Sequence, residues 1–237
     1  MRNYLIYNGI ASDSFDLYLG GQASFNAPKR KFTKVKVPGR NGDIIIDQNC
    51  SFENINVPYN IVGMNNFKEK TTEIKEWLAS STRYCRIEDT YDPTVFRMGM
   101  IVSDISFTMK RLNQTGKAKI VFDCKPQRFL ISGEMKNKIY GNDVIYNPTE
   151  FKSNPLIRVD GHGVLMINGN TIIVGGSQGT TIIDSETMDC YTLDRQNVNR
   201  TVLFQGNKFP VLVPKENDIS YSGNITSVVI IPRWWTL

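Results

Sequence analysis

Short apolar runs separated by turn residues make up most of this chain. The runs are rich in Ile, Val, Tyr, Phe and Thr, and Gly, Asn and Pro interrupt them at short intervals. Many short strands separated by such turns are typical of β-sandwiches. The clearest predicted strands span residues 55–59, 98–105, 119–122, 156–159, 171–174 and 226–231. The pattern therefore predicts a mostly β protein.

One stretch, residues 66–81, follows a helical period instead. Glutamates and lysines occupy the positions between its apolar residues, as on a helix with one solvated face. The apolar positions are Phe67, Ile74, Trp77 and Leu78. Asn65 or Asn66 is suited to cap the start of the helix. The sequence thus predicts an all-β fold with one helix.

The apolar pattern is interrupted between Cys124 and Lys152, where turn residues cluster. Stretches of this kind are where domain boundaries fall. We therefore expect an N-terminal β domain over residues 1–130, a linker over 131–150 and a C-terminal β-sandwich over 151–237. At 237 residues the chain is long enough for two such domains.

Composition and charge are those of an ordinary globular protein. Charged residues make up 22% and apolar residues 41% of the chain, and the net charge is +5. The sequence contains no signal-peptide core and nothing approaching the roughly 20 apolar residues of a membrane helix. We therefore expect assembly in a cytoplasm without membrane contact. In that reducing environment we expect buried thiols at Cys50, Cys85, Cys124 and Cys190.

The sequence offers no convincing catalytic or metal-binding constellation. The single histidine, His162, lies between two glycines, and no Cys-x-x-Cys pair accompanies it to form a zinc site. A general base or metal ligand is one interpretation, and a turn residue is the simpler one. The carboxylate pairs of Glu88 with Asp89, and of Asp184 with Glu186, do not define the separation on which glycosidase chemistry depends. We expect no enzyme activity, no cofactor and no metal.

The segment 37–43, Val-Pro-Gly-Arg-Asn-Gly-Asp, is set between two strand-like stretches. Asn41 and Gly42 accept positive φ angles, which a tight type I′ hairpin requires. Pro38 suits a strand end because it donates no hydrogen bond. The sequence therefore predicts a β-hairpin that turns at Asn41 and Gly42.

Basic residues gather on the strand before this turn. Six fall within a dozen residues that contain no acid, and they are Lys29, Arg30, Lys31, Lys34, Lys36 and Arg40. If Lys34 and Lys36 share a strand face, they form a positive strip suited to nucleic acid or an acidic partner. A solvated edge strand, whose lysines prevent unwanted pairing, is the simpler interpretation. The modest net charge and the lack of interleaved aromatic residues count against nucleic-acid binding as the main role.

Two adjacent tryptophans, Trp234 and Trp235, stand at the C-terminal end of the sequence. Adjacent residues of a strand point to opposite faces, so at most one of them enters the core of a one-sided sheet. The other needs a partner, and a neighbouring domain, a neighbouring subunit or a sugar ring would each serve. Packing against protein is the preferred interpretation.

A series of short motifs runs in order along nearly the whole chain. They are Tyr7-Asn8-Gly9-Ile10, Leu17-Tyr18-Leu19, Pro28-Lys29-Arg30, the 37–43 segment, Ile74-Lys75-Glu76-Trp77-Leu78, Glu88-Asp89, Tyr91-Asp92-Pro93-Thr94-Val95-Phe96-Arg97, Val121-Phe122-Asp123-Cys124-Lys125-Pro126, Asn154-Pro155-Leu156-Ile157, Ile183-Asp184-Ser185-Glu186, Phe209-Pro210 and Pro232-Arg233-Trp234. In number, order and spacing they resemble the motifs of the distal tail proteins of long-tailed bacteriophages, also called the phage tail component family. The 37–43 segment is the most recognisable of them.

The resemblance implies a structural virion protein of a siphophage or prophage. In that family, six N-terminal domains close into a homohexameric ring that joins the tail tube to the baseplate or tail fibre. The ring leaves a channel through which DNA passes when the genome is ejected. The implied partners are further copies of the chain, the tail tube protein, and a tail-associated fibre, lysin or other baseplate protein at the tail tip.

Within such a ring, the basic strip has two candidate places, the lumen and the subunit interface. Strong phosphate contacts would slow the passage of DNA, so we favour the interface, with Arg40 paired to a carboxylate of the next subunit. The helix at 66–81 is expected to contribute as well. The expected interface residues are Lys34, Lys36, Pro38, Gly39, Arg40, Asn41, Gly42 and Asp43.

The resemblance also implies that the C-terminal β-sandwich is galectin-like. Docking of other baseplate proteins and recognition of host-wall carbohydrate are the alternatives for this domain. The polar residues of a galectin sugar site cannot be placed around His162 or Trp234, so docking is preferred. Trp234 and Trp235 are the candidate contacts with a partner protein or a glycan. A wall hydrolase is the third alternative, and it lacks a spaced nucleophile–base or metal constellation.

Overall fold

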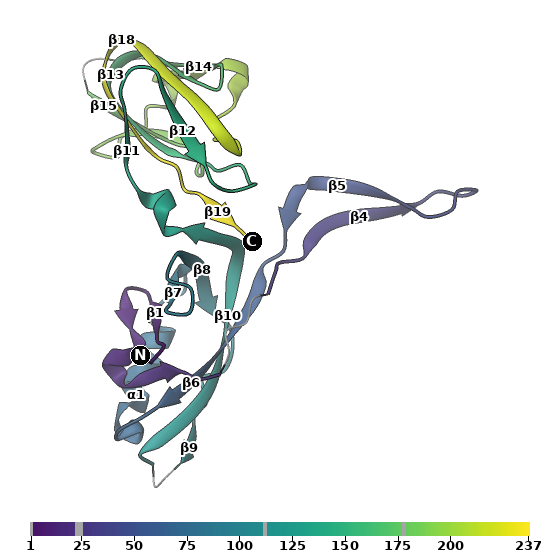
Figure 1. The fold of residues 1–237 in the computed structure, drawn as a ribbon, viewed down its shortest axis with the longest axis vertical. Coiled ribbons are helices and arrows are strands. Elements are labelled where there is room, and N and C mark those ends of the chain that lie inside the picture. The colour runs from purple at the N-terminus through teal and green to yellow at the C-terminus, as the bar shows by residue number, and fades with distance from the viewer. Residues whose placement is uncertain (1, 22–25, 111–112, 177–178) are drawn as a thin grey trace. The chain divides into compact units, whose positions relative to one another are not determined.

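The structure is a computed structural model that describes residues 2–21, 26–110, 113–176 and 179–237, with side chains outside residues 47–51. This part of the chain is mostly β with one α-helix, as the apolar pattern predicts (Figure 1). Within it, no helix has the length and apolar character needed to cross a membrane. The chain divides into two compact units: unit 1 comprises Met1–Arg128 with Leu237, and unit 2 comprises Phe129–Thr236.

Unit 1 is built around one large antiparallel sheet. The order of its strands is β2-β1-β7-β8-β10-β6-β3, with β9 paired to β10, while β4 and β5 form a separate two-stranded sheet. The strand bounds are β1 (Leu5–Tyr7), β2 (Ile10–Ala11), β3 (Leu17–Leu19), β4 (Arg30–Lys36), β5 (Asp43–Phe52), β6 (Ile55–Gly63), β7 (Cys85–Asp89), β8 (Val95–Ile101), β9 (Thr108–Lys110) and β10 (Thr115–Leu130). The C-terminal end of β10 continues into unit 2.

The helix α1 (Phe67–Ala79) packs against the core of unit 1. Its buried residues are Phe67, Ile74, Trp77 and Leu78, as their spacing predicts. Alternate residues of β6 are buried in the same core, and these include Ile55, Val57, Tyr59 and Ile61. The helix therefore uses its apolar face for its own subunit, and its outer face is charged.

The start of α1 differs in one detail from the prediction. Asn66 occupies the capping position with φ +51°, but its side chain makes no capping hydrogen bond. Instead, the backbone N–H groups of Phe67 and Lys68 donate to the carbonyls of Gln114 and Asn113, each at 3.3 Å. The free donors of the helix end are thus satisfied by the turn before β10, which ties α1 to the sheet.

Two opposed glycines make room for the helix on the sheet. Gly63 on β6 lies opposite Gly116 on β10. A Cβ atom at Gly63 would lie 2.0 Å from the ring of Phe67, and one at Gly116 would lie 2.2 Å from it. The missing side chains therefore form the slot that holds this buried ring.

Unit 2 is a β-sandwich made by two long strands that bend together. The pairing of β13 with β18 is irregular between Asp160 and Gly161, and Gly161, Gly163 and Gly223 all have positive φ. The strand bounds are β11 (Asn137–Ile139), β12 (Asp143–Asn147), β13 (Leu156–Ile167), β14 (Asn170–Val174), β15 (Thr180–Asp184), β16 (Asp189–Thr192), β17 (Val202–Phe204) and β18 (Lys215–Ile231). The short strand β19 (Trp235–Thr236) pairs with β10 and not with a strand of the sandwich.

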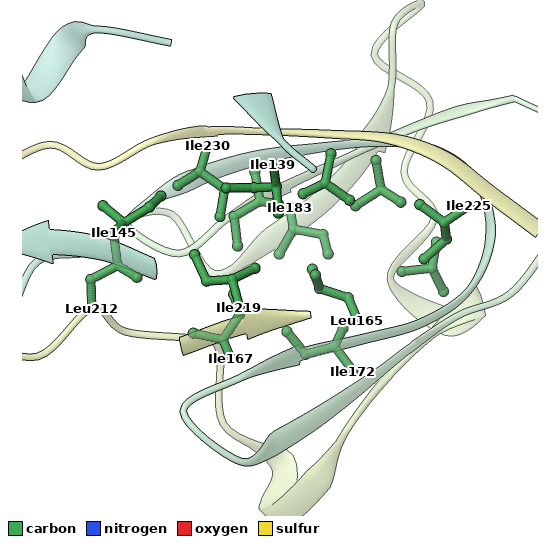
Figure 2. Packing of buried hydrophobic residues seen from close by; sticks show 14 of the residues in the cluster. Ile139, Ile145, Leu165, Ile167, Ile172, Ile183, Leu212, Ile219, Ile225 and Ile230 are labelled. Atoms are coloured by element: carbon green, nitrogen blue, oxygen red, sulfur yellow. The ribbon is translucent and has the colours of Figure 1, made fainter. Parts of the chain in front are cut away.

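The bend divides unit 2 into two layers. One half has the order β11-β18-β13-β15-β16, and the other has the order β12-β18-β13-β14-β17. Figure 2 shows isoleucines and leucines from both halves meeting between the layers, including Ile139, Ile145, Leu165 and Ile230. This core confirms the predicted sandwich architecture.

The segment 131–150 is not a linker. It carries a short 3-10 helix (Ile131–Glu134) and the strands β11 and β12, and both strands pair with β18. Ile139 and Ile145 are buried in the core of unit 2. Turn residues in this segment separate two short strands of the sandwich, which from sequence alone is hard to distinguish from a boundary between domains.

Candidate functional site

The predicted hairpin is present as β4 and β5, but its turn is not a two-residue type I′ turn. The loop between the strands spans residues 37–42, and the Arg40 N–H donates to the Val37 carbonyl at 3.2 Å. Gly39 has φ +80° and Gly42 has φ +85°, as predicted for Gly42, whereas Asn41 does not have positive φ. Proline followed by a positive-φ glycine is the arrangement of a type II turn. Pro38 and Gly39 therefore determine the turn, and the prediction at Asn41 was wrong.

The hairpin is exposed from residue 30 to residue 46. Every residue from 30 to 46 is exposed, including Val35 at 38%, Ile45 at 63% and Ile46 at 51%. A two-stranded hairpin is marginally stable in water without further packing. Large apolar side chains exposed together on such an element indicate an interaction surface.

The register of β4 and β5 separates two faces. Val35 lies opposite Ile44, and Thr33 lies opposite Ile46. Because opposed residues share a face in an antiparallel pair, these four residues form one face without charges, which we call the apolar face. Its exposed isoleucines and valine have no cover within the described chain.

The second face of the hairpin, which we call the basic face, carries the predicted lysines. Lys34 lies opposite Ile45 and Lys36 lies opposite Asp43, so the two lysines share a face as expected. The Lys34 ammonium lies 5.6 Å from the ring centroid of Phe32, within reach of a weak cation–π contact.

The remaining predicted interface residues lie in the loop between the strands. Pro38, Gly39, Arg40, Asn41 and Gly42 are all exposed there. Arg40 forms no ion pair with any described residue. The structure therefore brings the predicted residues together on one exposed element, and it adds the apolar face, which only the strand register reveals.

The two C-terminal tryptophans find their partners within unit 2. Trp234 is 4% exposed and belongs to the core. Trp235 stacks on Phe151 with ring centroids 4.3 Å apart, and its indole N–H donates to the Lys152 carbonyl at 2.9 Å. Trp234 is therefore buried, and one face of the Trp235 ring is occupied by Phe151.

An ion pair that sequence reasoning did not find joins two of the motifs. The Arg233 guanidinium donates to both carboxylate oxygens of Asp184, at 2.6 and 3.1 Å. Burial raises the pKa of Asp184, but the hydrogen bonds and positive charge of Arg233 outweigh it and hold the pKa below its usual value. In the sequence, the only indication of this ion pair was that the two motifs carry opposite charges.

The described cysteines are free, and their environment makes two of them unreactive. Cys85 is half-buried, and Cys124 and Cys190 are buried. Burial raises the pKa of Cys124 and of Cys190 to about 12, so both stay protonated at neutral pH. The side chain of Cys50 lies outside the described residues.

The isolated histidine is a strand residue rather than a turn residue. His162 lies on β13 at its bend, with Nε2 2.9 Å from the amide nitrogen of Asn224. No cluster of three His, Cys, Asp or Glu side chains suited to a metal occurs in the described part of the chain.

No family model and no curated protein sequence matches this chain. Among solved structures, it is similar to the SPP1 Dit (gp 19.1) protein, described as a paradigm of the hub adsorption apparatus in phages that infect Gram-positive bacteria. The identity is 14%, the match covers 100% of both chains, and the TM-score is 0.75.

The chain is also similar to chains of the phage P2 baseplate in its activated conformation. With Ca the identity is 10%, 97% of each chain is covered and the TM-score is 0.57. With Sr the identity is 10%, the coverage is 97% of this chain and 98% of the other, and the TM-score is 0.54. The likeness spans both β-units, and the chain therefore has the fold of phage tail hub and baseplate proteins.

Proposed function

We propose that this protein is the hub at the distal end of a siphophage tail, where six copies close into a ring that joins the tail tube to the baseplate or tail fibre. The observation that carries the proposal is the β4–β5 hairpin, exposed over residues 30–46, on a chain with the hub fold. The role is structural and includes no catalytic step. The ring is assembled in the host cytoplasm and leaves an opening for DNA in transit.

The apolar face of the hairpin supports a contact with a second copy. Burying Val35, Ile44 and Ile46 would stabilise the assembly by removing apolar surface from water, at about 25 cal/mol for each Å². A hairpin that covers a different surface on the next subunit makes a heterologous contact. Such contacts generate a ring when their rotation closes, and six copies satisfy that condition in this proposal.

The charged residues supply orientation in the same contact. Lys34, Lys36 and Asp43 lie on the basic face, and Arg40 at the loop pairs with a carboxylate of the next subunit. Charged groups at the rim of an interface contribute register and specificity more than affinity. Because the basic strip lies at the interface, it does not bind the phosphates of DNA that passes through the channel.

Light scattering across a concentration series tests ring formation. A closed ring of six 26.9 kDa chains has a mass of about 160 kDa, and negative-stain images of that species should show a central opening. A monomer that persists at high concentration, with or without added tail tube protein, contradicts the proposal.

Two neighbouring substitutions test which face makes the contact. Ile46→Asp places a charge on the apolar face, and Ile45→Asp places the same charge on the basic face. We expect Ile46→Asp to leave folded monomers and Ile45→Asp to retain the ring. Equal assembly of both variants would show that the hairpin does not form the interface through this face.

A further inference from the structure

A second basic surface lies on unit 1, on the face of the large sheet that points away from α1. It is an open groove of about 530 Å³ that crosses β6 and β10. The groove reaches from Gly20, just after β3, to Ser106, just before β9. Figure 1 shows β6, β9 and β10 side by side at this end of unit 1. We call this feature the sheet groove.

The alternation of β10 places two lysines in the sheet groove. Gly116 faces the buried ring of Phe67, so Lys117, the next residue along the strand, points to the other face of the sheet. Lys119 lies two residues further along and therefore shares the face of Lys117. Both lysines are exposed and line the groove.

The neighbouring strand does not neutralise these two lysines. Lys117 lies opposite Val62, and Lys119 lies opposite Asn60. A carboxylate at either position would have paired with the lysine across from it. Neither lysine forms an ion pair with a described residue, and none of the described residues that line the groove carries a carboxylate. Two like charges on one face repel each other, so this surface favours a negatively charged ligand.

The charged residues on adjoining segments do not reverse this balance. Arg2 lies over the ring of Tyr18, on the strand next to β6, and adds a third positive charge on the same face. Of the acids on these segments, Asp16 is held by an ion pair with Lys70, and Asp104 does not line the groove. The sheet groove therefore lies in basic surroundings and complements an acidic partner.

The floor and walls of the groove suit a peptide better than a nucleic acid. A Cβ atom at Gly20 would lie 2.8 Å from the Val62 side chain, so the missing side chain leaves this apolar group uncovered. Asn60, Ser106 and Thr108 provide polar groups around it. Val62 is suited to contact an apolar side chain rather than a phosphate. The described lining includes no aromatic side chain on which a base could stack.

The spacing of the two lysines specifies the form of the ligand. Residues two apart in a strand project to one face about 7 Å from each other, because each residue rises by about 3.4 Å. An extended segment with aspartate or glutamate at alternate positions presents its carboxylates at the same spacing. Each carboxylate can then meet one ammonium group, that of Lys117 or that of Lys119.

We propose that the sheet groove binds an acidic, extended segment of another protein, with aspartate or glutamate at alternate positions and an apolar side chain that covers Val62. The inference rests on the proposed function only in expecting this partner among tail proteins. It does not depend on ring formation, because a single chain supplies every residue that lines the groove.

Selection from a random twelve-residue peptide library on the full chain tests this inference. The library is first depleted on the double variant Lys117→Gln/Lys119→Gln, which we call the groove variant. This step removes peptides that bind elsewhere, including those that bind the basic face of the hairpin. We expect the enriched peptides to carry aspartate or glutamate at alternate positions. Their synthetic copies, measured by fluorescence anisotropy, should bind the groove variant at least tenfold more weakly than the unmodified chain.

The matched control is the double variant Lys152→Gln/Lys208→Gln. Both of these lysines are exposed in unit 2, and their removal changes the net charge by the same two units. Peptide binding should be unchanged in this control. Equal weakening in the two double variants would indicate general charge attraction and overturn the inference. The absence of enriched peptides after depletion, or enriched peptides without acidic residues, would also overturn it.

A short DNA duplex tests the other anionic occupant. We expect the duplex to bind the groove variant and the matched control equally, because two removed charges weaken a non-specific contact to the same extent. If the duplex binds more tightly than the selected peptides and this binding is lost only in the groove variant, the groove belongs to nucleic acid and the inference is wrong.

Thermal melting and light scattering of the groove variant complete the test. Unchanged melting shows that the variant is folded, so that lost peptide binding reports on the sheet groove. A folded groove variant that fails to form the ring of the unmodified chain would assign this surface to subunit contacts and overturn the inference. An unmodified chain that stays monomeric but binds the selected peptides would count only against the proposed function.

Discussion

Unit 1 contains two long antiparallel pairs that differ in what covers them. β6 and β10 pair over nine positions, and alternate residues of β6 are buried under α1. β4 and β5 are also paired over most of their length, yet residues 30–46 are all exposed. Strand pairing and burial therefore have different sources. Neighbouring strands pair through their own backbones, whereas burial of their side chains requires a further surface that packs on them.

The apolar patterns of β6 and β5 differ in the same way as the burial of the two strands. β6 alternates buried and exposed positions, as a strand with one covered face does. Ile44, Ile45 and Ile46 are consecutive, so apolar side chains lie on both faces of β5. Such a run is typical of a strand covered on two sides. The hairpin therefore has the composition of a covered strand, which agrees with its place in the proposed ring.

The largest expected effect contrasts one isoleucine from each pair. Ile61 is 2% exposed on β6, and Ile45 is 63% exposed on β5. Ile61→Ala should lower the free energy of unfolding by about 3 kcal/mol, because it removes transfer energy and leaves a cavity. Ile45→Ala should change it by less than about 0.5 kcal/mol. Urea unfolding of the monomer measures both, and a large loss at Ile45 would show that the hairpin packs within its own subunit.

The glycines of the two pairs provide the next contrast. Gly116→Ala should destabilise unit 1 by about 2 kcal/mol, because the new methyl group meets the buried ring of Phe67. Gly39→Ala should cost about 1 kcal/mol, because the space around it is open and only its positive φ is unfavourable. Combining Gly116→Ala with Phe67→Leu should recover part of the lost stability. If nothing is recovered, the glycines do not serve to make room for the Phe67 ring.

Ionic contacts extend the comparison to unit 2. The partly buried pair of Asp184 with Arg233 should contribute about 2 kcal/mol, more than exposed charges of the hairpin. Because the Asp184 pKa is lowered in the folded state, this stability is present above the ordinary aspartate pKa near 4 and is lost as pH falls through the folded value. Thermal melting from pH 6 to 3 should show this decline. Asp184→Asn should lower the melting temperature at pH 6 and make it depend less on pH below that.

The smallest expected effect concerns the charge at the hairpin loop. Arg40→Ala should leave the unfolding free energy within about 0.5 kcal/mol, because Arg40 is exposed and contacts no described carboxylate. It should weaken ring assembly only severalfold, since an ion pair at the rim of an interface contributes at most about 1 kcal/mol. Analytical ultracentrifugation at low and high salt measures the shift. Complete loss of the ring would indicate that Arg40 is buried in the contact.

Local pattern was sufficient for the helix, for most strands and for the hairpin that carries the candidate interface residues. The period of Phe67, Ile74, Trp77 and Leu78 predicted α1, and alternating lysines predicted a strand with a basic face. The predicted turn type was wrong because Pro38 and Gly39 form a type II turn ahead of the Asn-Gly pair, in which Gly42 has a positive φ and Asn41 does not. The resemblance of the motifs pointed to a hub protein before any fold was known.

By itself, the sequence determined which stretches become helix and strand, because backbone preference and side-chain period act over a few residues. Only the tertiary structure decided that Gly63 and Gly116 face each other across Phe67, that β13 and β18 bend together, and that Asp184 meets Arg233. It also decided which hairpin residues form the apolar face, since that depends on strand register. Contacts between distant residues arise from how whole elements pack, and no local pattern encodes them.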